Sequence, residues 1–153
     1  MIITFEGIEG SGKSLHIKNV ANYLKKKKIK FIKIREPGGS KNSEKIRKLI
    51  LNNKSNFNKY TDLFLYLASR SENIEKIIIK NYQKKVILID RFSDSTLAYQ
   101  HYGMGISKKI IELINKLRPN TRNRNREPHI TVEPVCVTAF NELDTTILRV
   151  HVD

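Results

Sequence analysis

The sequence predicts an α/β protein with a parallel sheet that is covered by helices on both faces. Two apolar runs, Ile2–Phe5 and Val86–Asp90, are continuous rather than alternating, as is typical of strands buried on both faces. Segments with helical spacing of apolar residues alternate with the expected strands, which favours parallel pairing. Ligands bind beyond the carboxyl ends of such strands, so we expect a site in three loops: Gly7–Ser14, Glu36–Lys41 and Arg91–Gly105.

Each expected element is supported by its local pattern. Apolar residues recur at near-helical spacing after the first run. The second strand alternates, and the proline and two glycines of Glu36–Ser40 end it. In chain order the expected elements are strand Ile2–Phe5, helix Leu15–Leu24, strand Lys30–Arg35, helix Ile46–Ile50, helix Tyr60–Tyr82 and strand Val86–Asp90.

Composition limits the class of protein. The chain of 153 residues has the length of one domain, and 39% apolar with 29% charged residues is typical of a soluble globular protein. No stretch approaches the roughly 18 consecutive apolar residues of a membrane span. The first apolar run is too short for a signal-peptide core, and the single cysteine, Cys136, cannot form an internal disulfide. We therefore expect a cytoplasmic protein with no membrane partner.

The net charge of +14 raises the question of nucleic-acid binding, because lysine and arginine neutralise phosphates. Most of the lysines are scattered through segments rich in lysine, isoleucine and asparagine. The run Lys25–Lys28 fits the solvated end of a helix. The sequence has no basic stretch interleaved with aromatic residues of the kind that single-strand binders use. We therefore expect no nucleic-acid partner, and a basic nucleic-acid binder ranks behind the enzyme classes below.

The segment "GIEGSGKS" fits the phosphate-binding pattern G-x-x-x-x-G-K-[ST] at every fixed position and stands between an expected strand and an expected helix. Its glycines let backbone N–H groups face phosphate oxygens, Lys13 can bridge the β- and γ-phosphates, and Ser14 can bind Mg²⁺. The structural alternative is a glycine-rich turn without a ligand. The pattern indicates a nucleoside triphosphate but does not identify the acceptor. The expected ATP-binding residues are Gly7, Ile8, Glu9, Gly10, Ser11, Gly12, Lys13 and Ser14.

Two further segments carry candidate acceptor residues. Asp90 and Arg91 follow a strand, where a carboxylate can hold the metal through water and a guanidinium can bind phosphate. Asp-Arg at a strand end also occurs as a structural ion pair. Tyr66 and Arg70 lie four residues apart on one helix face, where a ring can stack on a base and an arginine can donate to its carbonyl. Tyr66 as core filling and Arg70 as solvated surface is the alternative.

Four blocks in order, "FEGIEGSGKS", "REPGGS" with "EKIRKLIL", "FLYLASR" and "DRFSDSTLAYQ", resemble the bacterial thymidylate kinase family from Met1 to about Lys116. The resemblance implies a P-loop nucleoside-monophosphate-kinase fold and ATP with Mg²⁺ as phosphate donor. It also implies dTMP as acceptor, dTDP as product on the route to dTTP, and a homodimer. Composition and spacing alone reach only as far as a phosphate-binding α/β protein.

The resemblance also implies a role for each matching residue. Tyr66 takes the place of an aromatic residue that stacks on thymine, and Tyr99 that of a tyrosine near C2′ that excludes ribonucleotides. Lys13, Arg91 and Glu9 take the catalytic positions, with Arg35 as a further phosphate contact. The metal positions are Ser14 and, through water, Asp90. The implied dTMP-binding residues are Glu36, Arg47, Tyr66, Arg70, Arg91, Thr96, Tyr99 and Gln100.

The last part of the chain departs from the family pattern. We expect a kinase core in residues 1–117 and a divergent tail in residues 118–153, because no lysine follows Lys116 and no family block follows it convincingly. Pro128–Val135 resembles the next core strand faintly, and the arginine-rich segment 118–128 is an alternative lid. A truncated or altered C-terminus would leave an apolar sheet edge exposed. Loss of a lid arginine would reduce the rate about a thousandfold by analogy with arginine fingers.

Two other functions remain open from the sequence. One is a P-loop kinase for another nucleotide or deoxynucleoside, against which Tyr99 and Arg70 argue. The other is a remnant that binds nucleotide without catalysis. A substrate panel separates the first from a dTMP kinase, and tight binding without product identifies the second.

Overall fold

The computed structural model describes residues 1–52, 54–116, 130–133 and 146–152. The chain divides into two compact units. The first, called the sheet unit, comprises Met1–Arg35, Lys80–Phe92 and Asn123–Asp153. The second, called the helical unit, comprises Glu36–Ile79 and Ser93–Arg122. The candidate lid at residues 118–128 and the cysteine at position 136 lie outside the described residues.

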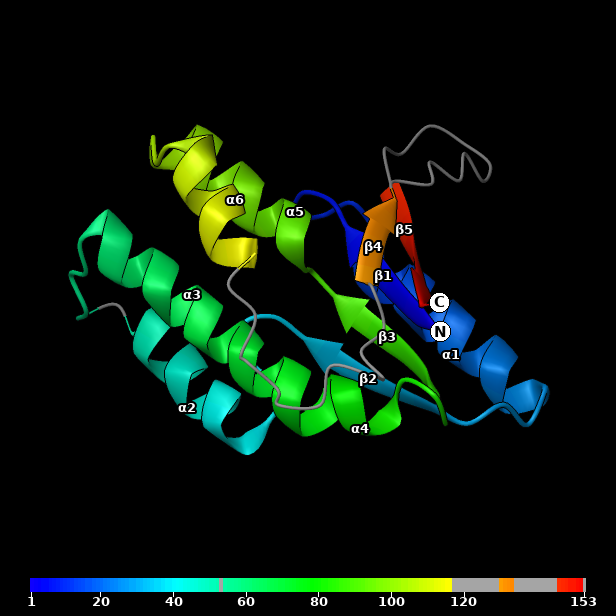
Figure 1. Cartoon of the computed structure of the whole chain (residues 1–153). Coiled ribbons are helices and arrows are strands. Elements are labelled where there is room, and N and C mark those ends of the chain that lie inside the picture. Colours follow the sequence, from blue (N-terminus) through cyan, green and yellow to red (C-terminus); the bar gives the residue numbers. More distant parts are fainter. Residues whose placement is uncertain (53, 117–129, 134–145, 153) are drawn as a thin grey trace. The chain divides into compact units, whose positions relative to one another are not determined.

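The sheet unit is built on three parallel strands, as the sequence predicts. β1 (Ile2–Glu6) pairs with β3 (Val86–Asp90), and β3 pairs with β2 (Phe31–Arg35). The full strand order is β2-β3-β1-β5-β4 (Figure 1), where β4 is Ile130–Glu133 and β5 is Thr146–Val152. In the parallel part, the carboxyl ends of the strands meet at one edge, where the side-chain chemistry described below begins.

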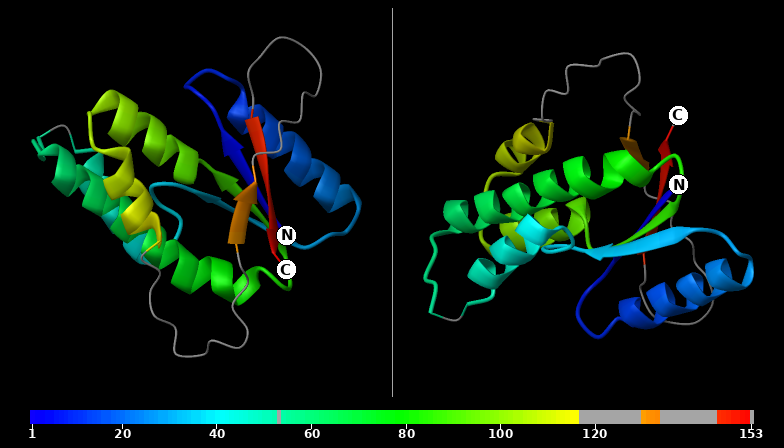
Figure 2. Two further views of the ribbon diagram at one scale, coloured as in Figure 1. Left: turned by 45° about the horizontal axis from the view of Figure 1, so that its top comes forward. Right: turned by 90° about the horizontal axis from the view of Figure 1, so that it is seen from below.

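The last two strands correct one expectation. The apolar edge beside β1 is not exposed, because β5 pairs with it in antiparallel direction along its whole length, from Ile2–Val150 to Glu6–Thr146. β4 then pairs with β5, also antiparallel (Figure 2). The physical reason is that unpaired N–H and C=O groups of an edge strand accept an extended segment of either direction. The sheet is therefore mixed rather than purely parallel.

The core of the sheet unit lies between one helix and the central strands. α1 (Lys13–Lys26) packs Ala21 and Leu24 against Phe5 and Leu88 of the central strands. Phe5 and Leu88 are fully buried. Lysines in the last turn of α1 complement the negative end of the helix dipole, as expected from the sequence. This packing fixes the start of α1, and with it the glycine-rich loop before it.

The helical unit contains the other long helices. α2 (Lys41–Ile50) begins earlier than the apolar spacing predicts, because the hydroxyl of Ser40 caps it by accepting from the Ser43 N–H at 3.2 Å. The Asn58 side chain caps α3 (Lys59–Asn73) by accepting from the Tyr60 and Thr61 N–H groups. Leu63 of α3 and Ile111 of α6 (Lys108–Lys116) form one buried cluster with Ile106, which precedes α6. The remaining elements, in chain order, are α3 (Lys59–Asn73), η1 (Ile74–Ile78), α4 (Ile79–Asn81), α5 (Ser93–Thr96), η2 (Leu97–Gly103) and α6 (Lys108–Lys116).

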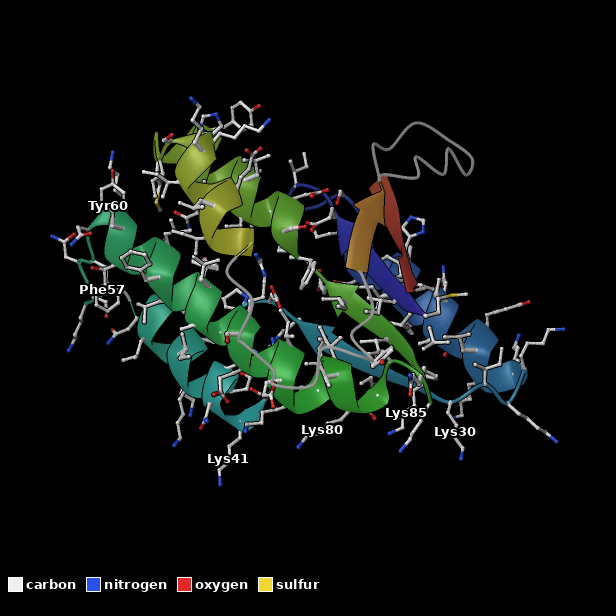
Figure 3. The ribbon with its side chains drawn as sticks, in the orientation of Figure 1. Lys30, Lys41, Phe57, Tyr60, Lys80 and Lys85 are labelled. Carbon is white, nitrogen blue, oxygen red and sulfur yellow. The ribbon has the colours of Figure 1, made fainter. Side chains whose placement is uncertain are left out.

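The surface agrees with the interpretation of the lysines as solvated. Lys30, Lys41 and Lys80 are exposed and extend away from the ribbon (Figure 3). Among the helices of the described residues, none is long and apolar enough to cross a membrane.

Candidate functional site

The glycine-rich loop connects β1 to α1 in the sheet unit. Gly10 and Gly12 both have φ of +80°, a left-handed conformation that other residues adopt only at a cost. Gly12 is the N-cap of α1, so the loop runs directly into the positive end of that helix. Ile8 and Glu9 are exposed. The backbone path therefore has the form that binds an anion at a helix N-terminus.

Lys13, the first residue of α1, turns back over the loop. Its Nζ donates to the carbonyl oxygens of Gly7 at 3.0 Å and Ile8 at 2.5 Å, and to Oγ of Ser11 at 3.4 Å. The side chain is buried, and burial together with the nearby Arg91 charge lowers the pKa of Lys13 from its ordinary value. Asp90, Glu9 and Glu6 oppose that shift. The ammonium is thus held against the carbonyl groups of the glycine-rich loop.

The tip of β3 carries the second group of predicted residues. Asp90 lies in register with Phe5 on one side and with Arg35 on the other. Arg91 follows in a left-handed conformation with φ of +66°, which is uncommon for a residue with a side chain, and its N–H donates to the Phe5 carbonyl oxygen at 3.0 Å. This geometry turns the chain sharply at the edge where the glycine-rich loop also begins.

The residues at this edge fit Mg²⁺. Oδ1 of Asp90 is buried and has no hydrogen-bond partner among the described residues, while Ser14 exposes its side chain in the first turn of α1. No cluster of three or more His, Cys, Asp or Glu side chains that could hold a metal occurs in the described part of the chain. Mg²⁺ does not need one, because it keeps several waters and binds through one or two carboxylates together with substrate phosphates.

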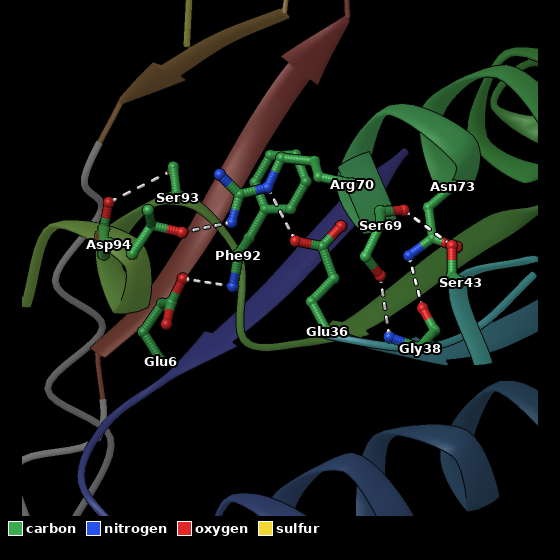
Figure 4. A network of polar contacts seen from close by, with 11 residues as sticks. Glu6, Glu36, Gly38, Ser43, Ser69, Arg70, Asn73, Phe92, Ser93 and Asp94 are labelled. Atoms are coloured by element: carbon green, nitrogen blue, oxygen red, sulfur yellow. Dashed lines mark hydrogen bonds and ion pairs between the residues drawn. The ribbon is translucent and has the colours of Figure 1, made fainter. Parts of the chain in front are cut away.

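Glu6 belongs to the same edge, although the sequence interpretation assigned it no role. It ends β1, is 4% exposed, and its Oε1 accepts from the Phe92 N–H at 2.7 Å (Figure 4). The bond holds the turn that carries Arg91. The sequence signal that could have indicated a role for Glu6 is an acidic residue directly after an apolar strand, as in "FEG".

The loop Glu36–Ser40 is the first part of the site in the helical unit, and two helices hold it. The Gly38 N–H donates to Oγ of Ser69 at 3.1 Å, and Nδ2 of Asn73 donates to the Gly38 carbonyl oxygen at 2.5 Å (Figure 4). Oδ1 of Asn73 accepts from the Ser40 N–H at 2.9 Å. Ser69 and Asn73 are fully buried. These hydrogen bonds fix the loop, because leaving a buried polar group without a partner costs more free energy than a formed hydrogen bond contributes.

Gly38 has no room for a side chain. A Cβ there would lie 2.7 Å from Oε1 of Glu44 and 3.2 Å from Cδ of Arg47. Its φ of +120° is a conformation that residues with side chains rarely adopt. Arg47 also donates from Nη1 to the Pro37 carbonyl oxygen at 2.6 Å, which ties α2 to the loop. Nη1 of Arg47 therefore helps to shape the loop.

Arg70 joins two other predicted residues, Glu36 and Thr96, in one buried cluster. Its Nε donates to Oε2 of Glu36 at 2.7 Å, and its Nη2 donates to Oγ1 of Thr96 at 2.6 Å. Burial raises the pKa of Glu36, and the charge of Arg70 opposes that rise. Oε1 of Glu36 is buried without a hydrogen-bond partner among the described residues. The interpretation of Arg70 as solvated surface is excluded, since it is 7% exposed.

The other predicted acceptor residues are placed as follows. Tyr66 is half-buried one turn before Arg70 on α3, and Tyr99 in η2 is 47% exposed. Gln100 is buried and bonds to Asp62. Seven of the eight predicted acceptor residues thus belong to the helical unit, whereas Arg91 belongs to the sheet unit.

Sequence interpretation missed the residues that position this group. Four residues contact the loop or the predicted site residues, and no sequence pattern assigned them a role: Ser43, Ser69, Asn73 and Asp62. A faint signal was present, because Asn73 and Ser69 are polar residues four apart that flank Arg70 on a helix with a strong apolar pattern. Their partners in the loop lie 31 to 35 residues away in sequence, beyond the reach of local patterns.

Comparison with known proteins decides the family. A sequence model described as "Thymidylate kinase" matches residues 5–132. The chain belongs to the thymidylate kinase family. It is 38% identical over 133 residues to the thymidylate kinase of Kosmotoga olearia, covering 86% of this chain and 62% of that protein. It is 44% identical over 116 residues to that of Thermosipho africanus, covering 75% of this chain and 58% of that protein.

A solved thymidylate kinase has the same fold. The crystal structure of the Ehrlichia chaffeensis protein matches with a TM-score of 0.71 at 38% identity, over 79% of this chain and 69% of that one. The α/β fold of thymidylate kinases is therefore confirmed. The family match extends past the expected limit near Lys116 to residue 132, which includes most of β4. The chain spans about half to three fifths of the length of the curated relatives it matches.

Proposed function

We propose that this chain transfers the γ-phosphate of ATP to dTMP and yields dTDP, a step of dTTP synthesis, in the cytoplasm. The observation that carries the proposal is the buried cluster of Arg70, Glu36 and Thr96. A glycine-rich phosphate loop serves many reactions, but a buried arginine with donors fixed in one plane suits a base carbonyl. Membership of the thymidylate kinase family supports thymine as that base.

The donor side of the proposal rests on the sheet unit. The loop Gly7–Ser14 would enclose the ATP phosphates, with Lys13 Nζ exchanging its carbonyl partners for phosphate oxygens. Glu9 would face a bound sugar or orient an arginine. Ser14, and Asp90 through water, would hold Mg²⁺, which when bound would supply positive charge beside the ATP phosphates. Lys13 and Arg91 would place further positive charge around that group, which is how protein residues accelerate this transfer.

The acceptor side rests mainly on the helical unit. Tyr66 would stack on thymine, while Arg70 would donate to its carbonyl and Thr96 and Gln100 would line its edge. Tyr99 would exclude a 2′-hydroxyl. The acceptor phosphate would be bound by arginines, with Glu36 shaping the metal and nucleotide site. These phosphate contacts are Arg35, Arg47 and Arg91.

We also propose a homodimer, and a division into a kinase core at residues 1–117 and a divergent tail at 118–153. A single assay tests the central proposal. Formation of ADP is followed by a coupled assay with ATP, Mg²⁺ and dTMP, next to dUMP, dCMP and dGMP. The proposal expects turnover that requires ATP and prefers dTMP. Preference for another acceptor would assign a different kinase, and tight binding of dTMP without ADP formation would assign a non-catalytic nucleotide binder.

A further inference from the structure

A half-buried carboxylate at the beginning of α3 bonds to a buried amide of η2. Gln100 is 1% exposed, and its Nε2 donates to Oδ2 of Asp62 at 3.0 Å. Asp62 is in the first turn of α3, where the positive end of the helix stabilises a carboxylate. The two residues are 38 positions apart in sequence, and both belong to the helical unit.

Asp62 determines which way the Gln100 amide points. An ionised carboxylate only accepts hydrogen bonds, whereas an amide has one accepting and one donating end. With the amide reversed, Oε1 of the buried Gln100 would face the oxygen of the half-buried Asp62, and two acceptors would meet without a donor. Leaving such groups unpaired costs about 1–3 kcal/mol each. The amide is therefore fixed with its NH₂ group toward Asp62.

The opposite end of the amide is a buried hydrogen-bond acceptor without a donor among the described residues. Oε1 of Gln100 is buried and bonds to no group of the described residues. Arg70 lies on the same helix as Asp62, two turns further along, and presents donors rather than acceptors. The helical unit thus contains both a fixed hydrogen-bond donor, the Arg70 guanidinium, and a fixed acceptor, Oε1 of Gln100.

We propose that Asp62 is a positioning residue that makes the acceptor site select a base with N–H at N3 and oxygen at C4, by holding the Gln100 amide in one orientation. The inference rests on the proposed function, in which Gln100 and Arg70 meet the base. Thymine presents an N3–H donor beside a C4 oxygen acceptor and matches both groups. Cytosine presents an N3 acceptor beside an amino donor, so both contacts would be mismatched.

The test is the preference for dTMP over 5-methyl-dCMP, which has the same methyl group, sugar and phosphate but the reversed pattern on the base edge. Dissociation constants of both nucleotides are measured by calorimetry on the 153-residue chain and on Asp62→Asn. An asparagine at this position can either accept or donate, so it permits both amide orientations. The preference for dTMP should fall about 10- to 100-fold, the ratio expected for one buried hydrogen bond.

Two further variants separate positioning from general damage. Glu72→Gln removes another carboxylate from the same helix, one that accepts from Asn42 at the surface, and should leave the preference unchanged. Gln100→Leu should lower the preference by a similar factor, and adding Asp62→Asn to it should cause no further loss, because Asp62 acts through Gln100. Thermal unfolding confirms that each variant is folded.

The outcomes distinguish this inference from the proposed function. An unchanged preference in folded Asp62→Asn overturns the inference, as does full additivity of the two substitutions. A native chain that prefers dTMP in binding, loses the preference in Asp62→Asn and forms no ADP supports the inference and contradicts the proposed phosphotransfer. A native chain that does not distinguish the two nucleotides overturns the inference even if it forms ADP.

Discussion

The two glycine-containing loops that follow β1 and β2 are held in different ways. The loop Gly7–Ser14 is shaped by its own backbone, by the start of α1 and by one lysine that reaches back over it. The loop Glu36–Ser40 is shaped by side chains from α2 and α3, which satisfy its N–H and C=O groups. The first loop is therefore suited to bind a ligand with its backbone N–H groups, whereas the second has most of its polar groups paired within the fold. Substitutions should accordingly affect catalysis in the first loop and stability in the second.

The largest effect is expected from Lys13→Met. It removes the buried ammonium while keeping most of the apolar side chain, so the fold should persist. We expect phosphotransfer from ATP to dTMP to fall about a thousandfold, because a charged group aimed at the transferring phosphate is lost. The coupled ADP assay measures this, and urea unfolding serves as the control. A variant within tenfold of the native rate would contradict the role of Lys13.

Arg70→Ala should affect stability most. It leaves Glu36 buried without its partner, and breaking a buried pair in this way costs about 3–5 kcal/mol. Urea unfolding of the native and variant chains measures the loss. The double variant Glu36→Gln with Arg70→Met should lose less, since no unpaired charge remains. A loss under about 0.5 kcal/mol in Arg70→Ala would show that the pair does not hold the loop.

Asn73→Ala should have a somewhat smaller effect. The Gly38 carbonyl oxygen and the Ser40 N–H lose their partner, and because water can enter the space that the deleted amide leaves, we expect a cost of about 1 kcal/mol for each group. Because these bonds hold the loop with Glu36, the affinity for dTMP should weaken together with stability. Calorimetry and urea unfolding test both. Loss of stability with native dTMP affinity would separate the loop from acceptor binding.

The smallest effect is a difference between two glycines. Gly10→Ala introduces a Cβ at φ of +80° in open space, which costs about 1–2 kcal/mol from the backbone alone. Gly38→Ala adds a clash with the Glu44 carboxylate, which cannot move away without losing its bond to the Gly39 N–H. We expect Gly38→Ala to lose roughly 1 kcal/mol more in unfolding free energy. Equal losses would remove the distinction between the loops.

The parts of the fold that depend on residues close together in sequence could be predicted from the sequence. β1, β3 and α1 follow from local apolar patterns, and the glycine-rich loop follows from eight contiguous residues. The predicted helix Tyr60–Tyr82 is confirmed as α3, η1 and α4, but its π-helical turn in the middle has no local signal. The pairing of β5 with β1 could not be predicted, because it depends on strands separated by most of the chain.

The candidate site shows the same limit. The phosphate loop with Lys13 was predictable because its residues are adjacent in sequence and carry a specific spacing. The Arg70 cluster was predictable only as separate residues, since its members come from three segments. Asp62 was not predictable, because an acid in the first turn of a helix is ordinary helix chemistry until its partner Gln100 is known.

One crossed titration tests most directly whether the two loops serve two different nucleotides. ATP with Mg²⁺ and dTMP are each titrated by calorimetry into the native chain, Lys13→Met and Gln100→Leu. We expect Lys13→Met to weaken ATP binding and retain dTMP binding, and Gln100→Leu to weaken dTMP binding and retain ATP binding. If both variants weakened the same nucleotide to the same extent, or if the native chain bound neither, the assignment of donor and acceptor to these two parts of the chain would be contradicted.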